Sequence, residues 1–209
     1  MHELAIGWKG YASASTTMAD AKHSTMAHEA RLAEDRALLL AFHRGSDEAA
    51  RLLWARHAGR LRWFAHSMVG GELADDVVQS VFLRVLGLRR SSLKSVEDPA
   101  AWLCTLTRNA ALNMQRTGTR AKRREASAMA PTATEPTGLD DLERVLDVLP
   151  QPQREALVLR HSYGFTLERL AGVLGVSRST AAERYAKGLA LAREQLTAPS
   201  SDGVTQHVG

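Results

Sequence analysis

Apolar side chains recur every three or four residues along most of the chain from Arg31 onward, the spacing that places them on one face of an α-helix. The pattern is clear in residues 72–88, where Val78, Val81 and Phe82 share one face. No segment keeps the strict alternation of polar and apolar residues that is typical of a β-strand. The pattern therefore predicts an all-α protein.

Local signals for helix ends divide the first half into four helices. Ser46 is a predicted N-cap, Gly70 and Gly71 interrupt the pattern, and Asp98 precedes a proline in a first helical turn. The four predicted helices run from about Arg31 to Gly45, from Ser46 to about Val69, from about Glu72 to Leu88, and onward from Pro99.

Composition along the chain indicates two small helical domains. Residues 1–28 are rich in Ala, Ser and Thr without sustained periodicity, which predicts a disordered N-terminal tail of unknown role. Residues 125–138 hold two prolines and little that could pack, which is typical of a flexible linker. We expect one domain over residues 29–124, a second over 139–197, and a disordered polar tail over 198–209.

The overall composition excludes several classes of protein. No apolar run approaches the roughly 20 residues of a membrane-spanning helix, so we expect no membrane insertion and a cytoplasmic protein. Cys104 is the only cysteine and most simply belongs to the core. The eight histidines show no metal-ligand spacing and no glycine-rich loop could cradle a phosphate. We therefore expect no enzyme, no catalytic residue, no metal and no cofactor.

Charge changes sign sharply in the middle of the chain. From Pro99 to Arg124 there are several cations and no carboxylate, whereas acidic residues dominate from 125 to 149. On a helical wheel Asn109, Asn113 and Arg116 return near the direction of Trp102, beside an apolar stripe. Amides and guanidinium groups offer hydrogen bonds to bases and the basic run can neutralise phosphates. Periodicity leaves open whether Trp102 faces the core or the nucleic acid.

The second domain contains a helix-turn-helix pattern. Leu170 and Leu174 give a first helix its apolar face, Gly175 permits a tight turn, Val176 fills the angle between the helices, and Ser177 caps the next helix. The second helix would present polar residues toward the major groove. These candidate −35 DNA-binding residues are Arg178, Ser179, Thr180, Glu183, Arg184 and Lys187.

The string "LPQPQREALVLRHSYGFTLERLAGVLGVS" resembles region 4 of bacterial RNA polymerase sigma factors, in particular those of the extracytoplasmic-function (ECF) group. The string "DDVVQSVFLRV" resembles sigma region 2.2, the helix that docks on the clamp of the polymerase β′ subunit. That resemblance implies that core polymerase binds at Asp75, Asp76, Gln79 and Phe82.

The string "AWLCTLTRNAALNMQR" resembles sigma regions 2.3 and 2.4, which read the −10 element. In that family, the loop before this helix forms a pocket for a base flipped out of the −10 strand. The implied −10 DNA-binding residues are Ser92, Lys94, Arg108, Asn109, Asn113, Arg116, Arg120, Lys122 and Arg123. The resemblance implies an ECF sigma factor whose partners are the β and β′ subunits of core polymerase, promoter DNA and an anti-sigma factor.

Two other functions fit parts of the pattern. A helix-turn-helix transcriptional regulator, of the LuxR type for example, would read DNA without being a polymerase subunit. A sigma-like protein without initiation activity would bind core polymerase and yield no start site.

Overall fold

The computed structural model describes residues 18–125 and 145–197, and all the regular structure in these two ranges is helical, which confirms the all-α prediction. Residues 1–17, 126–144 and 198–209, which include almost all of the predicted linker and the C-terminal tail, lie outside the described residues. The helices are α1 Met18–His43, α2 Asp47–Val69, α3 Gly71–Leu86, α4 Arg90–Lys94, α5 Pro99–Glu125, α7 Gln151–Tyr163, α8 Leu167–Leu174 and α9 Arg178–Thr197.

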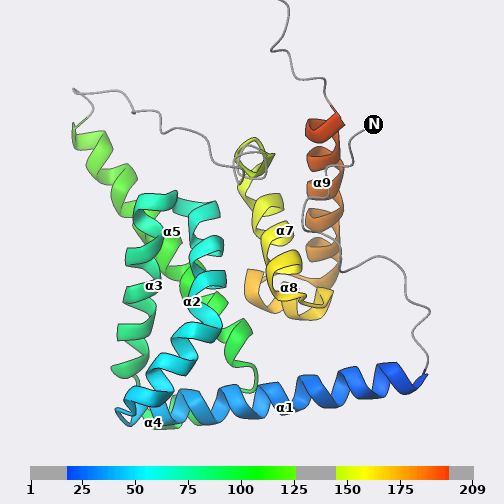
Figure 1. The fold of residues 1–209 in the computed structure, drawn as a ribbon. Coiled ribbons are helices and arrows are strands. Elements are labelled where there is room, and N and C mark those ends of the chain that lie inside the picture. The colour runs from blue at the N-terminus through cyan, green and yellow to red at the C-terminus, as the bar shows by residue number, and fades with distance from the viewer. Residues whose placement is uncertain (1–17, 126–144, 198–209) are drawn as a thin grey trace, which may run out of the picture.

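Helices α1–α5 form the first of two helical units (Figure 1). Helix α2 lies at its centre, packed against α1, α3 and α5. The side chains of Leu53, Leu61 and Phe64 are completely buried on α2. Val78 and Val81 on α3 are 1% exposed and meet them from the other side, as the apolar stripe predicts.

The predicted helix ends of this unit are confirmed. The Ser46 hydroxyl accepts a hydrogen bond from the Ala49 backbone amide at 3.3 Å, which caps α2. Gly70 ends α2 with a φ of 83°, a conformation that side chains other than glycine rarely adopt. Asp98 caps α5, since its carboxylate accepts from the Ala101 amide at 3.0 Å.

A buried carboxylate ties α1 to α2. Asp35 on α1 is 2% exposed and its carboxylate contacts His57 Nε2 at 3.1 Å and Arg56 Nη1 at 2.5 Å. Burial works to raise the pKa of Asp35, but the hydrogen bonds from His57 and Arg56 outweigh it and hold the pKa below its ordinary value. The ionised carboxylate is therefore part of the folded state.

Two elements differ from the sequence prediction. Helix α1 begins at Met18, so residues 18–28 are helical and not part of a disordered tail. The described side chains at this end of α1, residues 26–31, are all exposed and therefore form no buried stripe. The segment 90–94, predicted as loop, forms the short helix α4, anchored by Leu93, which is 2% exposed.

The second unit is the predicted helix-turn-helix with α7 packed behind it. Leu170 and Leu174 are buried, Gly175 takes the left-handed conformation with a φ of 65°, and the Ser177 hydroxyl accepts from the Thr180 amide at 3.1 Å. A Cβ at Gly188 of α9 would lie only 3.0 Å from Leu157 of α7, so the two helices pack closely there. The geometry of the helix-turn-helix is therefore set by local turn and cap residues.

The two units are packed against one another, whereas the sequence predicted domains without a fixed separation. Helix α7 lies on α2, and α8 lies on α5 (Figure 1). His28, near the start of the described side chains of α1, also contacts Arg169 of α8. The docking brings together residues that are far apart in the sequence.

Candidate functional site

Helix α5 presents an amide and guanidinium stripe to solvent. Asn109, Asn113 and Arg116 are all exposed, whereas Leu103 is buried on the adjoining side. The side chain of Trp102 is half-buried and packs against the core. The helix thus serves the core with one face and leaves the predicted DNA-binding stripe open on the other.

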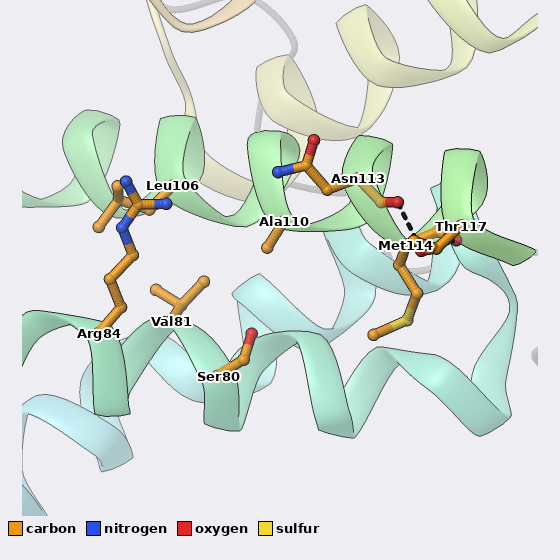
Figure 2. A pocket seen from close by; sticks show the side chains of 8 residues that line it. All are labelled: Ser80, Val81, Arg84, Leu106, Ala110, Asn113, Met114 and Thr117. Carbon is orange, nitrogen blue, oxygen red and sulfur yellow. Dashed lines mark hydrogen bonds between the residues drawn. The ribbon is translucent and has the colours of Figure 1, made fainter.

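A groove of about 380 Å³ lies between α3 and α5, next to this stripe. Figure 2 shows Arg84 reaching up from α3 beside Leu106 at one end, and Met114 at the other. The amide of Asn113 lies on the side of α5 that faces away from α3. The lining is apolar at its base, polar or cationic at its rim, and contains no carboxylate: Ser80, Val81, Arg84, Leu106, Ala110, Asn113, Met114 and Thr117.

Arg108, which the resemblance assigns to −10 DNA, is paired with α7 in this structure, so its assignment stays a prediction. Its Nε donates to Glu155 Oε2 of α7 at 2.7 Å, and only 21% of its side chain is exposed. In the docked arrangement its charge is directed at a buried carboxylate and not at solvent. The sequence motif places Arg108 next to Asn109, but one residue on a helix turns the side chain by about 100°.

Among the other predicted −10 residues, the structure describes the side chains of some but not of all. Ser92 and Lys94 lie on α4 and are exposed. The backbone of α5 continues helically to Glu125. The side chains of Arg120, Lys122 and Arg123 lie outside the described side chains, so their predicted phosphate contacts stay predictions.

Helix α3 carries the predicted polymerase-binding residues. Asp75, Asp76 and Gln79 are exposed, and Asp75 lies 3.8 Å from Arg62 on α2. Phe82 is only 6% exposed and packs tilted on the ring of Trp54, with a centroid distance of 4.9 Å. Phe82 therefore packs beneath this surface and exposes little of its own side chain to a partner.

An apolar groove of about 510 Å³ adjoins Gln79, and the sequence reasoning did not single it out. Leu83 is 69% exposed, Leu86 and Trp54 are each 44% exposed. These residues come from two helices, so no single helical stripe gives them away. The signal available in the sequence was an apolar residue, Leu83, directly after the motif residue Phe82.

Helix α9 presents the predicted recognition residues. Arg178, Ser179, Glu183 and Lys187 are exposed, and Thr180 and Arg184 are half-exposed. Lys187 Nζ contacts Glu183 at 2.7 Å, and this hydrogen bond holds the pKa of Glu183 below its usual value. Arg178 pairs with Glu168 of α8. Exposed ion pairs of this kind are weak, so Lys187 and Arg178 can exchange their carboxylate partners for DNA phosphates.

In the described residues, no group of His, Cys, Asp or Glu is placed to hold a metal ion. None of the described helices is long and apolar enough to cross a membrane.

The chain matches two family models, sigma-70 region 2 over residues 53–121 and sigma-70 region 4 over residues 139–191. It is 34% identical over 163 residues to the RNA polymerase sigma factor CarQ of Myxococcus xanthus, which covers 74% of this chain and 93% of CarQ. It is 30% identical over 148 residues to the ferric citrate uptake sigma factor FecI of Escherichia coli, covering 66% of this chain and 84% of FecI.

Solved structures with this fold include the sigma factor RpoE of Bartonella quintana in complex with the anti-sigma factor NepR, with a TM-score of 0.57, 26% identity, and coverage of 67% of this chain and 91% of RpoE. CnrH in complex with the cytosolic domain of CnrY gives a TM-score of 0.57 and 26% identity, covering 79% of this chain and 99% of CnrH.

The chain therefore belongs to the sigma-70 family of RNA polymerase sigma factors. Its relatives, which include the ECF sigma factor EcfG of Rhodopseudomonas palustris at 34% identity over 149 residues, place it in the ECF group. The first unit is region 2 and the second is region 4. The match to region 2 sets aside a helix-turn-helix regulator that acts without polymerase.

Proposed function

We propose that this sigma factor binds core RNA polymerase through α3 of region 2, reads the −35 element with α9 and holds the −10 strand on α5. The observation that carries the proposal is that region 2 presents two different surfaces, an acidic and apolar one on α3 and an amide and cationic one on α5. One unit can thus contact polymerase and DNA at once. The site of action is the cytoplasm, where these partners meet.

The polymerase surface combines a polar edge with an apolar centre. Asp75, Asp76 and Gln79 supply the edge, and Leu83 lies in the groove beside them. Exposed apolar residues rimmed by charges are typical of a protein-binding site. A helical partner such as a coiled coil would cover Leu83 while its cations meet the aspartates.

The −10 surface suits a single strand. Exposed amides of Asn109 and Asn113 can form paired hydrogen bonds with the edge of an unstacked base, and Arg116 can neutralise a phosphate. The groove between α3 and α5 offers apolar contact beside them without any repelling carboxylate. Unpairing a base costs a few kcal/mol, which these contacts can offset. Ser92 and Lys94, which are exposed on α4, would be further contacts to the same strand.

The −35 surface is the exposed face of α9. Its first turn, at Arg178 and Ser179, would approach base edges in the major groove, and Arg184 and Lys187 would contact phosphates. By analogy with the NepR and CnrY complexes, a protein partner of the anti-sigma kind would regulate access to these surfaces.

Run-off transcription with purified core polymerase tests the proposal. We expect promoter-specific starts that require both this chain and core enzyme. Promoter binding that does not require core enzyme would contradict the proposal, and binding to core without a start site would indicate a factor that has lost initiation activity.

A further inference from the structure

A single carboxylate lies at the centre of the exposed face of α9. The buried residues of this helix, Ala181, Gly188 and Ala192, face α7 and α8, on which α9 packs. Glu183 follows Ala181 by two residues, which places it about 200° around the helix and so opposite the buried side. It is exposed, and the next carboxylate along α9 is Glu194, about three turns later. An acidic group therefore projects from the middle of the surface that would face DNA.

Cations surround this carboxylate. Lys187 Nζ lies 2.7 Å from a Glu183 carboxylate oxygen, and the two side chains are 62% and 61% exposed. The hydrogen bond from Lys187 holds the pKa of Glu183 below its usual value, so the carboxylate is ionised at neutral pH. Arg184 is half-exposed beside it on α9. An exposed pair of this kind is weak, so both Glu183 and Lys187 can take other partners.

An ionised carboxylate in the major groove needs a hydrogen-bond donor, because it accepts hydrogen bonds only and the nearby phosphates repel it. The base edges there offer two kinds of donor, the amino groups of cytosine and adenine, whereas guanine and thymine present acceptors. Adenine also presents its N7 acceptor beside the amino group, where the second carboxylate oxygen would meet it. Cytosine has no such acceptor on the same base. The carboxylate of Glu183 therefore favours cytosine.

The other residues on this stripe of α9 discriminate less between bases. Ser179 lies one turn before Glu183 on the same face, and its hydroxyl is 2.9 Å from the Ser177 hydroxyl. A hydroxyl both donates and accepts, so it suits several bases. Ala186 and Ala190 continue the exposed stripe with small side chains that let the helix come close to the bases. Glu183 is thus the residue of the stripe with the sharpest chemical preference.

We propose that Glu183 selects a cytosine in the −35 element by accepting a hydrogen bond from the cytosine amino group, while Lys187 moves to a neighbouring phosphate. This inference rests on the proposed function for the role of α9. It adds the identity of one base and the residue that chooses it.

Sequencing of bound promoter variants tests the choice of base. Run-off transcription first supplies a promoter that the holoenzyme uses, and the base pairs around its −35 position are then randomised. We expect wild-type holoenzyme to enrich cytosine over guanine and thymine at one position by about tenfold or more, the order expected for a hydrogen bond to a charged group.

Two variants of Glu183 identify the position that it reads. Glu183→Gln should change the preference there to adenine, because an amide can pair with both the amino group and N7 of that base. Glu183→Ala should abolish the preference at that position and leave the others as they are. Glu194→Gln is the matched control, because Glu194 is exposed on a similar side of α9 but about three turns away, and it should change no position. A general loss of structure would instead weaken binding to all sequences alike.

The selection can contradict the inference in two ways. Unchanged preferences in Glu183→Ala would show that the carboxylate reads no base, and enrichment of any base other than cytosine at the responding position would show that it reads a different one. If run-off transcription yields no start site, the proposed function fails separately. The full chain without polymerase is then offered randomised duplexes, and cytosine at the position that responds to Glu183 supports the inference, whereas any other base or no preference overturns it.

Discussion

The apolar groove on region 2 leads to a quantitative prediction for polymerase binding. Leu83 is 69% exposed, so a partner that covers it removes most of a leucine side chain from water. Full burial of such a side chain is worth about 1.5–3 kcal/mol, so covering Leu83 is worth about 1–2 kcal/mol. We expect Leu83→Ala to lose most of this and to weaken binding to core polymerase about five- to tenfold.

Competition against fluorescently labelled wild-type protein for core polymerase measures this change. Leu196→Ala is the matched control, because Leu196 is 57% exposed but lies near the end of α9, far from the groove in the sequence and on the other unit. Neither substitution should lower the thermal midpoint appreciably, since both side chains are exposed. Equal affinities of Leu83→Ala and wild type, or an equal loss in Leu196→Ala, would refute the reasoning.

Three further predictions concern DNA and stability. Asn109→Ala combined with Asn113→Ala should impair promoter opening in a permanganate footprint while core binding is retained, because about 1–3 kcal/mol of base contact is lost at each amide. Arg184→Ala should weaken −35 duplex binding and lower the slope of log affinity against log salt by about 1, as for one phosphate contact. Asp35 stabilises the fold above its unfolded pKa of about 4 and this stabilisation is lost as pH falls through its lowered folded pKa. Asp35→Asn should therefore flatten the loss of stability in acid, measured by urea unfolding across pH.

For each of these three predictions, one experimental result would contradict the reasoning. Full permanganate reactivity in the double asparagine variant would remove the −10 assignment from that stripe. An unchanged salt slope would place Arg184 away from phosphate. Equal acid dependence of unfolding in Asp35→Asn and wild type would show that the Asp35 carboxyl is not responsible for the loss of stability in acid.

The helix ends were predictable because their causes are local. Ser46, Asp98 and Gly175 act within a few residues of themselves, so the sequence is enough to place a cap or a turn. Helix α4 and the start of α1 escaped prediction for the opposite reason. The short α4 is anchored by the tertiary packing of Leu93, and residues 26–31 near the start of α1 are all exposed, so neither leaves a periodic pattern in the sequence.

Exposure within the candidate site was also largely predictable. Helical periodicity separates Asn109 and Asn113 from Leu103, and it separates Asp76 and Gln79 from the buried valines of α3. The groove around Leu83 was not predictable from the sequence, because Trp54 and Leu83 come from different helices and only their packing makes one surface.

Arg108 shows why the rest of the site needed the structure. Its partner Glu155 is 47 positions away, and neither periodicity nor charge pattern pairs residues at that separation. Docking covers Arg108 but leaves Asn109 and Asn113 exposed. Phosphate contacts supply affinity and base contacts supply specificity. The docked arrangement therefore leaves exposed the amides that would choose a −10 sequence and covers one cation that would strengthen binding to it.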